Sequence, residues 1–493
     1  MLAWTIYISF IGAGVLLCLN PARRQAARAV ALVTALAGWG IALAGAMAGA
    51  DGQLHTIVKL PWVPSLGLQF YLAADGISLT LVVLTGLAAV TGILFSWNLE
   101  HRVKEFFAFY LALIGGVYGV FLSFDLFLLF VFYEIAIVPK YFLIAIWGST
   151  RKEYGAMKLA LYSFAGSALV LIGLVAAYVV AGSKTFDWVA LAQYPFPLGF
   201  QLWAFPLVFV GFAVLAGLWP LHTWAPTGHV AAPTAASMLL AGVVMKLGAY
   251  GALRVAMVLF PLGLSAWQKP IALLAVTGIV YGATVALAQK DLKFVIGYSS
   301  VSHMGFVLLG LMTLTQTGVS GAVLQMFSHG VIAGLLFAVV GRMVYDRTHT
   351  RELSVLEGMD LGRRLPFAAV TFTIAGVASM GLPGFSGFVA ELQVLIGAWQ
   401  AFPYYAILGG LGVVIGVAYT LRAVRRCFLG DHPMPPAPGH EALEPITVPE
   451  RVGSALLIAA TLAIGLYPRL LLDLIIPSLQ APWMQHMMKG GRP

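Results

Sequence analysis

The sequence contains few cysteines and few charged residues. Cys18 and Cys427 are its two cysteines, and both lie in or beside apolar segments. They provide neither a disulfide framework nor the spacing of a metal site. The sequence also lacks a glycine-rich phosphate-binding loop and a nucleophile motif. Nucleotide, flavin or iron–sulfur chemistry must therefore take place on other chains, and we expect no cofactor in this one.

The low content of charge excludes an ordinary soluble protein. Charged residues make up 10% of the chain and hydrophobic residues 60%, whereas about 25% of the residues of a soluble domain are charged. The chain is therefore predicted to be a membrane protein. Its net charge of +9 would suggest a nucleic-acid partner for a soluble protein. Here we attribute this charge to membrane topology, and we expect lipid and no nucleic acid as partners.

Apolar runs of about 20 residues indicate helices that span a bilayer. Fourteen such runs predict an all-α polytopic membrane protein. They comprise residues 3–20, 27–49, 76–97, 106–122, 126–147, 158–181, 203–224, 233–253, 270–289, 294–314, 319–345, 366–399, 404–427 and 453–472. No basic residue precedes the first run, and Arg23 and Arg24 follow it. This order is the reverse of that in a cleaved signal peptide.

The basic residues of the loops predict the orientation in the membrane. Most of the lysines and arginines lie in loops that follow odd-numbered runs, whereas the loops after even-numbered runs carry only Lys59, Lys184, Arg254 and Lys269. By the positive-inside rule the first set of loops faces the cytoplasm. Both termini are then expected to lie outside. Of the two long connectors, residues 51–75 contain strand-like pieces that favour an external hairpin, and residues 430–449 resemble an irregular cytoplasmic loop.

Two of the runs contain helix breakers in the middle of the membrane. The seventh run includes AGLWPLHTWAPTGH, with Pro220 and Pro226, and the twelfth includes MGLPGFSGF, with Pro383. Proline removes a backbone donor and clashes with the preceding turn. Breaks at matching places in two halves are typical of transporters built from inverted repeats. We therefore expect helices 4–8 and 9–13 to form such a repeat, with helices 7 and 12 broken.

This repeat divides the chain into four predicted regions. Residues 1–105 contain helices 1–3, residues 106–258 form the first half of the repeat and residues 269–428 form the second half. Residues 429–493 contain the cytoplasmic loop, helix 14 and the tail.

Four charged side chains lie deep within apolar runs. They are Glu134, Lys140, Lys246 and Glu391. A charge at the centre of a bilayer costs about 3 kcal/mol or more, and such residues are usually functional. Because acids and bases spread through a membrane interior are what a proton path requires, we interpret Glu134, Lys246 and Glu391 as proton carriers. The alternative is that a charge is paired to a neighbour for structural reasons alone.

Histidines near the breaks are candidates for a relay, because their charge changes near neutral pH. His222 and His229 flank the first break, while Gln325 and His329 share a helix face and His303 follows a serine-rich stretch. For His222 and His229 the alternative role is a polar cap on the broken helix. For the others it is hydrogen bonding between helices. Lys290, Asp291 and Lys293 lie at a predicted cytoplasmic helix end and are expected to be anchors at the membrane surface, with membership of the relay as the alternative.

Several motifs resemble those of a known family. They are YEIAIVPKYFLIAIWG, PLHTWAPTGHVAAPTAASMLLAGVVMKLGAYGALR, AQKDLKFVIGYSSVSHMGFVLLG, MFSHGVIAGLLF, DRTHTRE and GLPGFSGFVAEL. Together they resemble subunit M of bacterial respiratory complex I, the proton-translocating NADH:quinone oxidoreductase. The resemblance covers almost the whole chain and implies an antiporter-like subunit of the inner (plasma) membrane. It also implies neighbouring antiporter-like subunits L and N as partners.

The resemblance assigns roles to individual residues. The helix-5 glutamate of the family falls on Glu134, the helix-8 lysine on Lys246 and the helix-12 glutamate on Glu391, where subunit L usually has a lysine. The bridging histidines of the family fall on His222 and His229.

One departure from the family concerns helix 7. The family has a lysine seven residues before the first histidine, and Leu215 stands there in this sequence. Lys140 stands where an apolar residue is expected, six residues after Glu134 on the same helix. Six residues correspond to about 9 Å of rise and roughly 240° of turn, so the two side chains would not share a face on a straight helix. A helix bent at Pro139 would bring them closer. Our hypothesis is that Lys140 supplies the positive charge that Leu215 does not.

The sequence is compatible with three functions. The chain is expected to be a proton-translocating subunit without a redox centre. In a second interpretation it is a subunit of a related complex: a membrane-bound hydrogenase, a multisubunit Na⁺/H⁺ antiporter or an ion-coupled carbon-uptake complex. In a third it is a structural spacer whose channel is inactive because the helix-7 lysine is missing.

Overall fold

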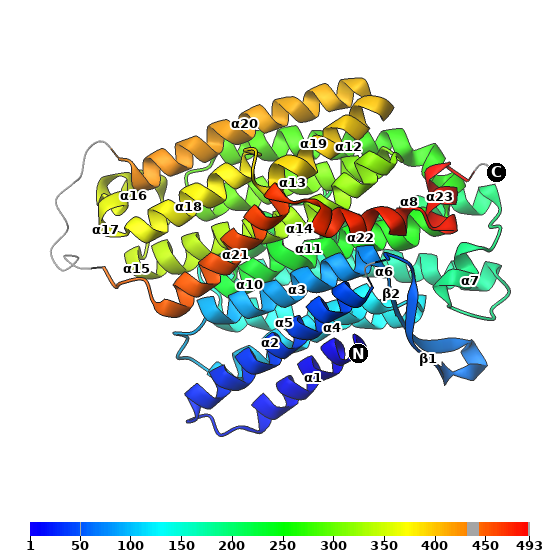
Figure 1. Cartoon of the computed structure of the whole chain (residues 1–493), viewed down its shortest axis with the longest axis horizontal. Coiled ribbons are helices and arrows are strands. Elements are labelled where there is room, and N and C mark those ends of the chain that lie inside the picture. The colour runs from blue at the N-terminus through cyan, green and yellow to red at the C-terminus, as the bar shows by residue number, and fades with distance from the viewer. Residues whose placement is uncertain (50, 431–442, 492–493) are drawn as a thin grey trace.

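The computed structural model describes residues 1–49, 51–430 and 443–491 of the chain. Long helices run side by side through the molecule, and the last helix, α23 (Pro482–Met488), lies at the same end as the hairpin of β1 and β2 (Figure 1). The predicted loop at residues 430–449 falls largely outside the described residues. Leu443–Thr447 precede the last long helix without regular structure.

The N-terminal part consists of three helices and the hairpin. Its elements are α1 (Ala3–Cys18), α2 (Arg24–Ala48), β1 (His55–Val63), η1 (Pro64–Leu66), β2 (Leu68–Ala74) and α3 (Gly76–Phe95). The strands are antiparallel and pair from His55 with Ala74 to Val63 with Leu68, so the expected hairpin is confirmed. Lys59 donates to Oδ2 of Asp187 at 2.7 Å. This hydrogen bond raises the pKa of Lys59 and ties β1 to the loop before α7.

The next elements include the first break. They are α4 (Val103–Leu122), α5 (Leu126–Trp147), α6 (Lys152–Val180), α7 (Trp188–Ala192), α8 (Leu198–Ala216), α9 (Trp224–Ala231), α10 (Thr234–Leu239), η2 (Leu240–Val244), α11 (Met245–Gly251) and η3 (Ala252–Met257). The seventh predicted run is split into α8 and α9 by the stretch that contains Pro220. The segments from α10 to η3 form one span, in which η2 and η3 are π-helical.

The remaining elements include the second break. They are α12 (Pro261–Ala288), α13 (Leu292–Met312), α14 (Gln316–Ala338), η4 (Val339–Tyr345), α15 (Asp346–Thr348), α16 (Leu353–Leu356), η5 (Glu357–Met359), α17 (Leu361–Arg364), α18 (Pro366–Ser379), α19 (Ser386–Ala401), α20 (Pro403–Phe428), α21 (Val448–Leu466), α22 (Arg469–Leu479) and α23 (Pro482–Met488). Pro383 lies between α18 and α19, so the twelfth predicted run is also interrupted.

Within the described residues, 12 helices are long and apolar enough to cross a membrane. Helices α1 and α18 are apolar but shorter. The prediction of a polytopic α-helical membrane protein is therefore confirmed. Two boundaries were wrong. The run placed at 270–289 begins at Pro261, because proline is well tolerated in the first turn of a helix. The run placed at 453–472 ends at Leu466, before Pro468.

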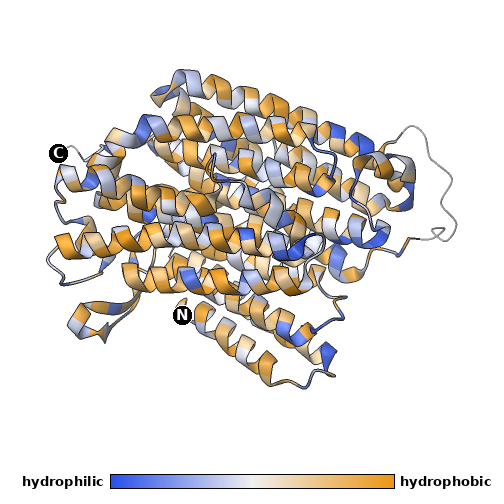
Figure 2. Ribbon diagram, turned by 180° about the vertical axis from the view of Figure 1, so that it is seen from behind, coloured by the Kyte–Doolittle hydropathy of each residue, from blue (hydrophilic) through white to orange (hydrophobic). Residues whose placement is uncertain are grey.

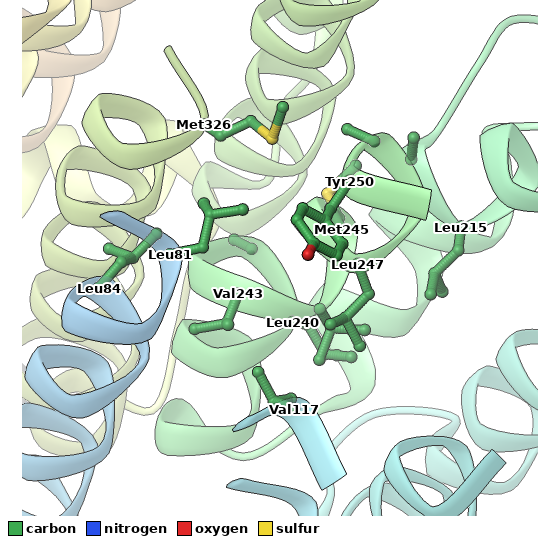
Figure 3. Packing of buried hydrophobic residues seen from close by; sticks show 14 of the residues in the cluster. Leu81, Leu84, Val117, Leu215, Leu240, Val243, Met245, Leu247, Tyr250 and Met326 are labelled. Carbon is green, nitrogen blue, oxygen red and sulfur yellow. The ribbon is translucent and has the colours of Figure 1, made fainter. Parts of the chain in front are cut away.

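Hydrophobic side chains cover the long helices, and hydrophilic residues gather mainly at the two ends of the bundle (Figure 2). Two spans, Thr234–Met257 and Gln316–Thr348, are buried by the rest of the chain along their apolar windows. Leu215 belongs to the apolar core and lies beside the helix that carries Met245 and Leu247 (Figure 3). These two central spans carry Lys246 and His329, and any site on them is shielded from lipid.

A buried ion pair fixes one end of the central span. Arg254 donates to Oδ2 of Asp75, and both side chains are almost fully buried. Asp75 also caps α3 by accepting from the backbone N–H of Ser78 at 3.0 Å. The pair therefore joins the start of α3 to the π-helical end of the span that contains Lys246.

Removal of one partner of this pair should strongly destabilise the protein. We expect Asp75→Ala to lower the stability by about 3–5 kcal/mol, because the guanidinium of Arg254 would stay buried without its partner. Thermal melting of the purified protein would measure the change. The double variant Asp75→Asn with Arg254→Met should be more stable than Asp75→Ala, and equal or lower stability would contradict this account.

Candidate functional site

Lys246 lies at the centre of the molecule and is fully buried, with 0% of its surface exposed. Its ammonium donates to the carbonyl oxygen of Ala241 and lies 2.7 Å from Nδ1 of His329. Ala241 belongs to the π-helical stretch η2. A π-helical turn changes the usual i→i−4 hydrogen bonding and often marks a functional site. The local backbone therefore offers an acceptor to a lysine that is buried within the protein.

Small residues allow this helix to pack closely. The Cα of Gly248 lies so near α8 that an added Cβ would come within 2.4 Å of the carbonyl oxygen of Phe212. The backbone of Leu215 takes part in the same close approach. The position at which the family has a lysine is thus held by a buried apolar residue on the helix next to the Lys246 helix.

A second cluster surrounds Glu391, on α19 just after the second break. Nδ1 of His303 lies 2.8 Å from Oε1 of Glu391, and Gln325 donates to the same oxygen at 3.1 Å. Nε2 of His303 lies 3.0 Å from the hydroxyl of Ser379, at the end of α18. His303 of α13 therefore contacts one residue on each side of the second break, Ser379 of α18 and Glu391 of α19.

His329 connects the two clusters. The ring centroids of His303 and His329 are 5.6 Å apart. A cavity of ≈ 10 Å³ lies between these histidines and Glu391 and is also lined by Ser299 and Gln325. About this volume is needed to hold one water molecule. Four of the residues that the sequence singled out, Lys246, His329, His303 and Glu391, thus form one buried line.

His222 and His229 lie at the first break. His229 on α9 is fully buried and stacks on Phe337 at a centroid distance of 4.6 Å. Ser237 donates to the carbonyl oxygen of His229 at 2.8 Å. His222 is also buried, and its ring lies edge-on to Tyr281 at 5.2 Å. His229 is thus adjacent to the start of the Lys246 span, while His222 faces α12.

Glu134 and Lys140 form a separate site on α5. Glu134 is half-buried beside Ser167 of α6, and Lys140 is only 1% exposed. Their charges interact electrostatically, but within the described residues they form no direct ion pair. The hypothesis requires the Lys140 ammonium to point into the protein and to lie within reach of Glu134, directly or through one or two waters. Lys140 is buried, but its ammonium has no hydrogen-bond partner among the described residues, so the role of Lys140 stays a prediction.

Sequence reasoning was wrong about Lys293 and missed Ser379. Lys293 is 3% exposed and donates to the carbonyl oxygen of Ala232 at 2.7 Å, so it is not an anchor at the membrane surface. Gln325 was predicted to take part in a water file with His329 and His303, whereas Ser379 was not identified.

Among the described residues, no group of three or more histidine, cysteine, aspartate or glutamate side chains could hold a metal ion. The site consists instead of single acids and bases in line through an apolar interior. The fold and the site define a polytopic membrane protein of the antiporter-like class, with its titratable groups arranged between broken helices.

Comparison with known proteins gives the family. Residues 123–416 match the family described as "NADH:quinone oxidoreductase/Mrp antiporter, TM". The chain is 39% identical to NADH-quinone oxidoreductase subunit M of Rhodobacter capsulatus over 475 residues, which cover 93% of this chain and 91% of the relative. It is 38% identical over 430 residues to an NAD(P)H-quinone oxidoreductase chain 4 of a Synechococcus strain, covering 85% of this chain and 80% of the relative.

Solved structures show the same fold. Respiratory complex I from Thermus thermophilus contains a chain that matches with a TM-score of 0.90 and 27% identity, covering 100% of both chains. A chain of the Mrp complex from Dietzia matches with a TM-score of 0.87 and 21% identity, covering 100% of this chain and 99% of that one. This chain belongs to the NADH:quinone oxidoreductase/Mrp antiporter family, and the resemblance to subunit M is confirmed.

The position of Glu391 generates a prediction about its chemistry. We expect Glu391→Gln to lose proton translocation, because a carboxamide does not titrate, and Glu391→Asp to retain much of it. Proton uptake by reconstituted vesicles would compare the two variants with wild type. Equal translocation by Glu391→Gln and wild type would refute the role of Glu391.

Proposed function

We propose that protons cross this chain along the buried line formed by Lys246, His329, His303 and Glu391. The chain is a proton-translocating membrane-arm subunit of the NADH:quinone oxidoreductase type, and the redox reaction takes place on other subunits. The observation that carries the proposal is the continuity of this line across four helices, α11, α14, α13 and α19, the last of which follows the second break.

Each contact in the line permits one proton transfer. A protonated Lys246 donates to Nδ1 of His329, and a second proton, taken up from the entry side, recharges the lysine. His329 and His303 face the cavity with room for about one water. His303 in turn shares a hydrogen bond with Glu391. Histidine both accepts and donates a proton near neutral pH, so two histidines between a lysine and a glutamate can relay a proton between them.

The arrangement in the membrane follows from the sequence. We infer fourteen transmembrane helices, with residues 106–258 and 269–428 as inverted halves, because both breaks fall at the fourth helix of a half. The arginine-rich and lysine-rich loops then face the cytoplasm. Both termini face the outside of a bacterial plasma membrane, and subunits L and N are the expected neighbours. Protons would leave toward the outside beyond Glu391.

The first half of the repeat contributes Glu134 and Lys140. In this proposal Lys140 replaces the charge missing at Leu215 and acts on Glu134 from the same helix. The burial of Lys140 and its electrostatic interaction with Glu134 support this role. A purely structural spacer would not require a fully buried lysine at position 246 with a histidine at hydrogen-bond distance.

The central test concerns Lys246. We expect Lys246→Ala to assemble but to lose most proton translocation, since no other described lysine contacts His329. Vesicles that contain the reconstituted complex would give the ratio of protons moved to electrons transferred. Lys269→Ala is a matched control, because Lys269 is exposed. Translocation at the wild-type ratio by Lys246→Ala would remove this residue from the mechanism and would contradict the proposed function.

A double exchange tests the role of Lys140. Lys140→Leu alone should impair proton translocation, because Glu134 would lose its nearby positive charge. The addition of Leu215→Lys should restore part of it by returning the charge to helix 7. Proton-to-electron ratios of the wild type and of both variants would decide. An unimpaired Lys140→Leu variant would show that Lys140 has no part in the path.

A further inference from the structure

An open cavity of ≈ 420 Å³ lies at one end of the bundle. We call it the vestibule, and its polar lining includes Ser96, Glu100, Thr234, Lys293, Arg342 and Asp346. The loops around it belong to the basic face that is expected to be cytoplasmic. Helices α10 and α15, which contribute to its wall, lie at the same end of the molecule as α16 and α17 (Figure 1).

The vestibule ends at the span that carries Lys246. Thr234 is the first residue of α10, and Gly341 of η4 lies against it. A Cβ added to Gly341 would come within 2.4 Å of the Thr234 hydroxyl, so the two helices approach each other closely here. The inner wall of the cavity is therefore the start of the helix that holds the central lysine.

Lys293 connects the vestibule with the C-terminal end of α9. Its ammonium donates to the carbonyl oxygen of Ala232, just after α9, although the residue also lines the cavity. It interacts electrostatically with Asp346 on the cavity side. His229, the buried histidine of α9, interacts electrostatically with both Lys293 and Lys246. His229 therefore interacts with Lys293 of the vestibule and with Lys246 of the buried line.

Asp346 lines the vestibule, and its carboxylate interacts electrostatically with Lys293. One of its oxygens accepts from Arg342 at 3.0 Å, and its side chain is 38% exposed. Arg342 is held in place by a second hydrogen bond of 2.6 Å to Glu450. Asp346 is thus fixed at one oxygen while the rest of its carboxylate faces the cavity, where water can deliver a proton.

We propose that the vestibule is the entrance through which protons reach Lys246, with Asp346 as the group that takes them up and Lys293 and His229 as the groups that pass them inward. Each step moves one proton and no electron: from water to the Asp346 carboxylate, from there through water to the neutral amine of Lys293, then to the His229 imidazole and on to the Lys246 amine. The inference rests on the proposed function.

The test uses the intact complex in vesicles. Asp346→Asn should lower the proton-to-electron ratio by as much as Lys246→Ala does, and Asp346→Glu should restore it. Glu357→Gln is the matched control, because Glu357 is an exposed carboxylate paired with an arginine at the same end of the molecule. It should leave the ratio unchanged.

A second measurement does not depend on the folding of Asp346→Asn. Thr234→Cys should translocate protons until a bulky, positively charged and membrane-impermeant thiol reagent is added on the basic face. The same reagent should spare Ser354→Cys, an exposed position at that end. Wild-type ratios in Asp346→Asn and in modified Thr234→Cys, with a low ratio in Lys246→Ala, would overturn the vestibule as the entrance. A wild-type ratio in Lys246→Ala would instead overturn the proposed function itself.

Discussion

The architecture depends on how the charge of Lys246 is accommodated in the interior of the protein. An ammonium group in an apolar interior is costly unless it is hydrogen-bonded. Here the carbonyl oxygen of Ala241 and the imidazole of His329 provide the partners. Neither is available in a regular, isolated helix: the first belongs to a π-helical stretch, and the second comes from a neighbouring span. The proton site thus exists only when the two central spans are packed together.

The ends of the broken helices pose a related problem. A helix end exposes carbonyl groups that need partners, because lipid offers none. At the C-terminal end of α9, Lys293 and Arg351 donate to the carbonyl oxygens of Ala232 and Val230, where the helix dipole favours positive charge. At the second break, the hydroxyl of Ser379 shares a hydrogen bond with His303. Residues next to the broken helices therefore contact groups of the proposed path.

Much of this could be predicted from the sequence, and the remainder has a physical reason. Long apolar runs and prolines have local causes, so the spans, the breaks and the hairpin followed from the chain itself. The contact of Lys246 with His329 joins residues 83 positions apart, and no local pattern encodes it. The π-helical stretches depend on tertiary packing for the same reason. Lys293 was misjudged because a lysine near a helix end usually reaches the surface, whereas this one turns inward to the carbonyl end of α9.

Leu215 stands where the family has a lysine on helix 7, and the lysine of this chain, Lys140, lies on the same helix as Glu134. This placement determines which helix movements can change the distance between lysine and glutamate. When a lysine and a glutamate lie on different helices, a shift of one helix against the other alters their separation and hence the proton affinity of each. When both lie on α5, the backbone fixes their spacing, and only side-chain rotation or bending near Pro139 remains. The distance between Glu134 and Lys140 therefore responds less to movement between helices. The line from Lys246 to Glu391 crosses α11, α14, α13 and α19, so relative motion of helices acts on every one of its contacts. Movement between helices can therefore alter proton affinities along this line more than it can on α5.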